Sequence, residues 1–342
     1  MLQELFARAM DEMSYLYMGT QKTGKTVAAA IGSLEEYLER EGAGDPRKFF
    51  ANPGVVPDME MSDFVRRRTY NLMHFRFDSP LYTPFRANNI VRGRYYERHG
   101  EPDAPMVALL HGWRMESYMF FDRFARLLVK WGFNCAMPDL PYHMSRTPKS
   151  SFAGEHTFKD DAIHTMETMR QSLFDTMTVL NWAKERKKAR MVGAMGVSFG
   201  ALLSGMMACA EPMLDFAVLV APPADPGRIF AASRLGRLIE KENPRVERLL
   251  RRYHEVMATM ALTKLTPLVD PANIFIAEGL YDGMVPPEVV DELWEKWNRP
   301  KIVRYPQGHL SVILFNKELE NDLEEWLRPF AQGLSANGIG GN

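Results

Sequence analysis

Between residues 105 and 306, short apolar segments alternate with longer helical ones, and this alternation constrains the fold more than any other feature of the chain. The apolar segments are 105–110, 133–140, 191–197, 216–223, 273–279 and 301–306. Continuous apolar runs of this kind are typical of parallel strands, which crossover helices bury on both faces. The sequence therefore predicts an α/β fold with a mainly parallel sheet and helices on both faces.

The N-terminal part of the chain predicts helices rather than strands. Residues 2–18 place apolar side chains at helical spacing, which predicts an amphipathic helix. The apolar positions are Leu2, Leu5, Phe6, Ala9, Met10, Met13 and Tyr17. A second helix is predicted from Thr26 to about Glu41, where Gly42 and Gly44 end it.

Strand-like sequence begins at about His74. The segments 74–77 and 92–98 predict two strands joined by a turn at 87–89. We accordingly divide the chain into three parts. They are a helical N-terminal extension over 1–73, a main α/β domain over 74–332 and a flexible tail over 333–342.

Residues 227–268 interrupt the alternation, because helical sequence is inserted there between two strands. Nine basic and four acidic side chains give the insertion a charge of +5, which fits either a solvated face or a cap that prefers anionic substrates. Its apolar face can line a pocket or pack on the sheet. That face comprises Leu235, Leu238, Ile239, Leu249, Leu250, Met257 and Met260. We predict a helical cap insertion over 227–268.

Composition excludes several classes of protein. The 42 Lys and Arg nearly balance the 43 Asp and Glu, whereas nucleic-acid-binding proteins usually carry a basic excess. No segment approaches the roughly 20 consecutive apolar residues of a membrane-spanning helix, and the charged N-terminal sequence does not resemble a signal peptide. We therefore expect a cytoplasmic protein without a membrane span, in which Cys135 and Cys209 are buried thiols.

Residues 196–200 read Gly-Val-Ser-Phe-Gly and match the pattern G-x-S-x-G. The pattern follows a predicted strand and opens a predicted helix, which is the setting of a nucleophilic serine on a tight strand-to-helix turn. Glycines are needed on both sides because a Cβ would clash in the crowded turn, and the N-terminus of the helix faces the reacting centre. Ser198 is therefore the predicted nucleophile.

A serine hydroxyl needs a base, and the base needs an acid that orients it. His309 follows the last predicted strand, so its imidazole is placed to reach Ser198. Asp282 follows the strand 273–279, at the same carboxyl edge of the sheet, and Asp225 after the preceding strand is the rival acid. His111 lies in a loop after the strand 105–110, where we expect it to be structural.

Together these segments resemble the α/β-hydrolase superfamily over roughly residues 74–332. The motifs His-Gly-Trp at 111–113, Gly-Val-Ser-Phe-Gly and Gln-Gly-His at 307–309 occur in that superfamily's order. The resemblance implies a serine hydrolase with Ser198, Asp282 and His309 as its catalytic triad. It also implies the backbone N–H groups of Trp113 and Phe199 as donors to the oxyanion.

Residues 19–26 supply an alternative, because they fit the phosphate-binding pattern G-x-x-x-x-G-K-[ST]. A phosphate-binding loop requires a buried strand directly before it, whereas 2–18 predict a helix. A polar loop between two helices, with Gly19 ending the first, explains the segment better.

These observations predict a serine hydrolase that cleaves a small-molecule carboxylic ester through an acyl-enzyme, with no metal and no cofactor. A peptidase or an acyltransferase could use the same three residues. A hydrolase fold that binds a ligand without turnover is a further alternative, although all three candidate residues are present. The sequence does not indicate an oligomeric state.

Overall fold

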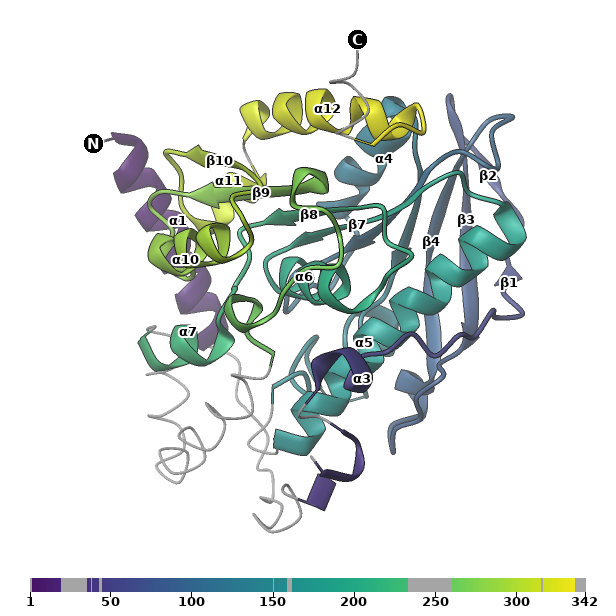
Figure 1. Cartoon of the computed structure of the whole chain (residues 1–342), viewed down its shortest axis with the longest axis horizontal. Helices are drawn as coiled ribbons and strands as arrows, with labels where there is room; N and C mark the ends of the chain where they lie inside the picture. The colour runs from purple at the N-terminus through teal and green to yellow at the C-terminus, as the bar shows by residue number, and fades with distance from the viewer. Residues whose placement is uncertain are drawn as a thin grey trace.

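The computed structural model describes residues 2–19, 36–37, 39–42, 45–149, 151–158, 162–232, 260–314 and 316–335. Ten described strands form one sheet in the order β1-β3-β4-β6-β5-β7-β8-β9-β10, with β2 also paired to β3 (Figure 1). Their bounds are β1 Glu60–Met61, β2 Val65–Arg66, β3 Tyr70–Asp78, β4 Ile90–Arg98, β5 Met106–Leu110, β6 Asn134–Pro138, β7 Val192–Val197, β8 Phe216–Val220, β9 Ile274–Gly279 and β10 Lys301–Tyr305.

The parallel part of the sheet runs from β6 through β5, β7, β8 and β9 to β10. All residues of β5 to β9 are buried, as expected for strands covered on both faces. Because the strands are parallel, the loops that follow β5, β7, β8, β9 and β10 leave from one edge of the sheet. The predicted α/β fold with a mainly parallel sheet is confirmed.

Helices cover both faces of this sheet. Helices α5, α6 and α10 pack on one face, and α4 and α12 pack on the other (Figure 1). The described helices are α1 Leu2–Gly19, α3 Pro46–Phe49, α4 Phe121–Trp131, α5 Ala162–Trp182, α6 Phe199–Ala210, α7 Pro226–Ala232, α10 Pro287–Lys296, α11 His309–Leu314 and α12 Lys317–Ala331.

The antiparallel end of the sheet is longer than the sequence predicts. Strands β3 and β4 pair along their whole length, with Tyr70 opposite Arg98 and Asp78 opposite Ile90. The two-residue strands β1 and β2 add to β3 from a stretch in which no strand was expected. Strands this short carry no periodic sequence signal, so only their pairing with β3 reveals them.

Helix α1 is present where it was predicted, but the face it buries is a different one. Leu5, Phe6 and Met13, which belong to the predicted apolar face, are 55–67% exposed. Among residues 3–14, whose burial the structure describes, Ala7 and Asp11 are the buried ones, at 1% and 3% exposed. Helix α1 contacts α11 (Figure 1), and this contact joins the first helix of the chain to the region of His309.

Several sequence predictions fall outside the described residues. They include most of the second helix from Thr26, the cap positions between 233 and 259, and the tail beyond residue 335. Of the predicted apolar cap face, Met260 is described, and it is fully buried in the core cluster that also contains Leu262. Cys135 and Cys209 are buried free thiols, as the sequence predicts.

Candidate active site

Ser198 stands at the turn between β7 and α6, in a backbone conformation that L-residues rarely adopt. Its φ is 52° and its ψ is −117°, a region that costs a non-glycine residue about 1–3 kcal/mol. A Cβ added at Gly196 would lie 1.9 Å from the Gly200 carbonyl oxygen, and one at Gly200 would lie 2.2 Å from the Leu110 carbonyl oxygen. The flanking glycines are therefore required by the crowding that the motif predicts.

The structure brings His309 and Asp282 to Ser198. The Nε2 atom of His309 is 2.8 Å from the Ser198 Oγ, and its Nδ1 atom is 2.7 Å from the Asp282 Oδ2. The other carboxylate oxygen of Asp282 accepts hydrogen bonds from the backbone N–H groups of Met284, at 2.8 Å, and Val285, at 2.7 Å. Both oxygens of Asp282 thus have partners, which fixes the carboxylate against the imidazole.

Asp225, the rival acid, has a different partner. Its carboxylate accepts a hydrogen bond from the backbone N–H of Arg228, at 3.0 Å, in the first turn of α7.

The contact of His309 with Asp282 also affects the pKa of the imidazole. Burial lowers the pKa of His309, but the charge and hydrogen bond of Asp282 and the charge of Asp11 outweigh it and raise the pKa above 6.5.

Two buried histidines support the loop that follows β5. The His111 ring donates from Nδ1 to the Gly112 carbonyl oxygen and accepts at Nε2 from the Leu140 N–H. The His143 ring accepts from the Arg114 N–H at 3.1 Å. Burial lowers the pKa of His111 to about 4, so the ring is neutral at pH 7. His111 is therefore structural, as the sequence predicts.

Two backbone N–H groups belong to residues close to Ser198. Trp113, in this loop, directly follows Gly112, where an added Cβ would lie 3.7 Å from the Ser198 Cβ. Phe199, directly after Ser198, is the first residue of α6. Within the part of the chain that the structure describes, neither N–H donates a hydrogen bond. Both can therefore bind an oxygen that becomes negatively charged.

A cavity of about 510 Å³ opens beside Ser198 and His309. Apolar side chains dominate its wall, among them Phe120, Phe121, Phe124, Phe158, Leu202, Ile229, Met284, Val285, Leu310 and Ile313. Apolar cavities of this size with a few polar groups at one end are typical of small-molecule sites. An apolar chain of a ligand can therefore lie in the cavity while a polar group reaches Ser198.

Helix α1 contributes residues that sequence reasoning missed. Met10, Met13 and Ser14 line the cavity, and the Asp11 carboxylate contacts the loops of Asp282 and His309. No motif marks these positions. Apolar periodicity assigns Met10 and Met13 to the apolar face of α1 but does not indicate that they border a ligand cavity, so this part of the site could be found only from the structure.

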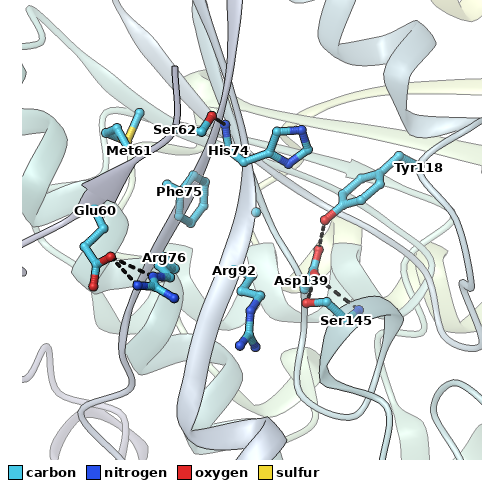
Figure 2. A pocket seen from close by; sticks show the side chains of 11 residues that line it. Glu60, Met61, Ser62, His74, Phe75, Arg76, Arg92, Tyr118, Asp139 and Ser145 are labelled. Atoms are coloured by element: carbon cyan, nitrogen blue, oxygen red, sulfur yellow. Dashed lines mark hydrogen bonds and ion pairs between the residues drawn. The ribbon is translucent and has the colours of Figure 1, made fainter. Parts of the chain in front are cut away.

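A second cavity, of about 410 Å³, lies over the antiparallel end of the sheet (Figure 2). Its two serines have other partners: Ser145 Oγ bonds to Asp139, and Ser62 Oγ bonds to backbone groups. Tyr118 also bonds to Asp139, and Arg76 pairs with Glu60. In this cavity neither serine hydroxyl is bonded to a histidine ring, in contrast to the cavity at Ser198.

Within the described residues, no group of three or more His, Cys, Asp or Glu side chains is arranged to hold a metal ion. No helix in the same residues is long and apolar enough to cross a membrane.

The helix before residues 19–26 argues against the alternative that this segment is a phosphate-binding loop. Residues 2–19 form α1 rather than a buried strand, and 20–26 lie outside the described residues. We predict that the protein binds neither ATP nor GTP, because a helix rather than a buried strand precedes the segment, and that Lys25→Ala changes ester turnover by less than about twofold. Equilibrium dialysis with labelled nucleotide tests this; Mg²⁺-dependent binding that Lys25→Ala abolishes would revive the alternative.

No family model matches the sequence. The uncharacterized protein Rv2627c of Mycobacterium tuberculosis (strain ATCC 25618 / H37Rv) is 30% identical over 318 residues, which cover 86% of this chain and 72% of the relative. The chain belongs to the Rv2627c family.

Two solved structures are similar to this Rv2627c-family protein. Acetyl xylan esterase 1 from Thermoanaerobacterium sp. JW/SL YS485 has a TM-score of 0.60 at 17% identity, covering 94% of this chain and 98% of that chain. The acetyl xylan esterase from Paenibacillus sp. R4 has a TM-score of 0.62 at 15% identity, covering 91% and 97%. The Rv2627c-family chain has the α/β-hydrolase fold.

Proposed function

We propose that the protein is a serine hydrolase that cleaves a carboxylic ester through an acyl-enzyme intermediate. The observation that carries this proposal is the continuous chain of hydrogen bonds from Ser198 through His309 to Asp282 at the wall of an apolar cavity. Nucleophile, base and orienting acid are thereby within contact distance before any ligand binds. The similarity of the fold to two acetyl xylan esterases agrees with this reaction class.

The proposed reaction begins when His309 accepts the Ser198 proton and the Ser198 Oγ attacks the ester carbonyl carbon. The carbonyl oxygen becomes an oxyanion, which the N–H groups of Trp113 and Phe199 stabilise. His309 then donates its proton to the leaving alcohol as the C–O bond breaks. Water, deprotonated by His309, attacks the acyl-enzyme and releases the acid and the free serine.

The apolar cavity supports esters whose acyl or alkyl part is a hydrocarbon chain or ring. Each methylene that leaves water for the cavity stabilises the bound state by about 0.8 kcal/mol. Turnover of p-nitrophenyl esters of increasing chain length, beside aminoacyl amides, tests this assignment. An enzyme that cleaves the amides and spares the esters would be a peptidase using the same three residues, and transfer to an added alcohol in preference to water would indicate an acyltransferase.

The cavity wall supplies a matched pair of variants for this substrate class. Phe120 and Leu280 are both 44% exposed, but only Phe120 lines the cavity. We predict that Phe120→Asp lowers kcat/KM about tenfold for octanoate esters and less than twofold for acetate, because the lost aromatic surface and the new charge oppose a long chain. Leu280→Asp should leave both values unchanged. Equal losses for short and long esters in Phe120→Asp would contradict this location of the chain.

A further inference from the structure

We infer that Asp11, in the N-terminal helix α1, is a positioning residue that holds the loops of Asp282 and His309 in register. This inference rests on the proposed function, because it assigns Asp11 a part in the same proton-transfer chain. Asp11 acts through the backbone. Its carboxylate accepts hydrogen bonds from backbone N–H groups, and none of these bonds involves the ring of His309 or Ser198.

The Asp11 carboxylate accepts three backbone hydrogen bonds from two separate segments, the loop after β9 and the start of α11. Its Oδ2 atom accepts from the Gly283 N–H at 3.0 Å and from the His309 N–H at 3.1 Å, and its Oδ1 atom accepts from the Leu310 N–H at 3.1 Å. Gly283 directly follows Asp282. One buried carboxylate thus connects the residue next to the acid with the backbone of the base itself.

The approach of α1 depends on Gly308, the residue before His309. A Cβ at Gly308 would lie 2.8 Å from the Asp11 Oδ2 and 3.1 Å from the Ala7 carbonyl oxygen, so a side chain there would push the helix away. Ala7 and Asp11 are one turn apart and are the buried positions among residues 3–14 of α1. This explains why a small residue and an acid are buried there while Leu5, Phe6 and Met13 stay exposed.

Asp11 also affects the base electrostatically. Among the described residues, the charged groups that act on the His309 ring are Asp282 and Asp11, and both raise its pKa. Burial, together with the charge of Asp282, raises the pKa of Asp11 above its usual value, and the backbone hydrogen bonds from Gly283 and Leu310 and the charge of His309 offset this only in part. Since the free base must be neutral to accept the Ser198 proton, a higher pKa of His309 places the acid limb of kcat/KM at a higher pH.

Two substitutions separate the hydrogen bonds of Asp11 from its charge. Asp11→Asn removes the charge and keeps one oxygen, which can still accept from the Gly283 and His309 N–H groups, while its NH₂ replaces the acceptor of the Leu310 N–H. We therefore expect the acid limb of kcat/KM to move to lower pH. Asp11→Ala removes every acceptor and frees both loops. We expect kcat for a p-nitrophenyl ester to fall roughly 10- to 100-fold, with a smaller change in KM, because the base is displaced from Ser198.

Glu12→Gln is the matched control, since it removes the same charge from an exposed neighbouring position of α1. It should leave the rate within twofold and the acid limb in place. The thermal unfolding temperature is measured for every variant. If Asp11→Ala does not fold, the pH profile of Asp11→Asn and the rate at which a fluorophosphonate labels its Ser198 still test the inference.

The inference is wrong if both Asp11 variants fold, keep the wild-type kcat within twofold and show the acid limb of Glu12→Gln. If the Asp11 variants only unfold at a lower temperature, with kcat and the acid limb unchanged, Asp11 is a purely structural residue and the inference fails. Ser198→Ala, assayed in parallel, separates this failure from that of the proposed function. If Ser198→Ala retains ester hydrolysis, the hydrolase assignment itself fails, whatever the Asp11 variants do.

Discussion

Ser198→Ala is expected to lower ester turnover by roughly 10⁴- to 10⁶-fold while the protein remains folded. The loss is this large because no other group can form the acyl-enzyme once the Oγ is removed. The folded state should persist or become more stable, since alanine needs no hydrogen-bond partner at this turn, although the positive φ of 52° stays unfavourable for any residue with a Cβ. Initial rates with a p-nitrophenyl ester and the unfolding temperature measure both effects.

Ser204 offers the matched control for that experiment. It lies on the same helix, α6, is fully buried, and its Oγ has no hydrogen-bond partner in the described structure. Ser204→Ala should therefore keep full activity, and a fluorophosphonate should label wild-type enzyme and Ser204→Ala at Ser198. Labelling at another serine in an active preparation, or activity that survives in Ser198→Ala, would contradict the assignment of the nucleophile.

The core of the fold could be predicted because its signal is local and repeated. Strands β5 to β9 are buried on both faces, so each appears as an uninterrupted apolar run. Ser198 and Asp282 follow such strands and His309 follows the partly exposed edge strand β10, and parallel strands bring their carboxyl ends to one edge of the sheet. The proximity of Ser198, Asp282 and His309 could therefore be expected from the chain alone.

The docking of α1 could not be predicted in the same way. Apolar periodicity assumes that a helix packs against other apolar side chains. Helix α1 instead packs against backbone N–H groups, and Asp11 is buried because it satisfies three of them. The absence of a side chain at Gly308 permits this contact, yet a glycine beside a histidine has many explanations in a sequence. Similarly, the two-residue strands β1 and β2 depend on pairing with β3.

The second large effect is expected for Asp282→Asn, which should lower kcat by about 10⁴-fold. The reason lies in the two oxygens of Asp282. The Oδ1 atom accepts from the Met284 and Val285 N–H groups, and the amide oxygen of asparagine is needed to keep those bonds. The amide NH₂ must then face the Nδ1 atom of His309. Because the amide NH₂ donates, Nδ1 must be the unprotonated nitrogen that accepts this hydrogen bond. The ring then carries its proton on Nε2, which therefore cannot take the proton of Ser198.

Asp225→Asn is the control, because its amide oxygen can keep the bond to the Arg228 N–H and its carboxylate has no bond to His309. We expect its kcat to stay within about twofold of wild type, as for other substitutions away from the reacting groups. Asparagine at position 282 preserves the hydrogen bonds of the loop, so the rate loss there should come without a large change in unfolding temperature. A crippling effect of Asp225→Asn beside an active Asp282→Asn would transfer the role of the acid to the loop after β8.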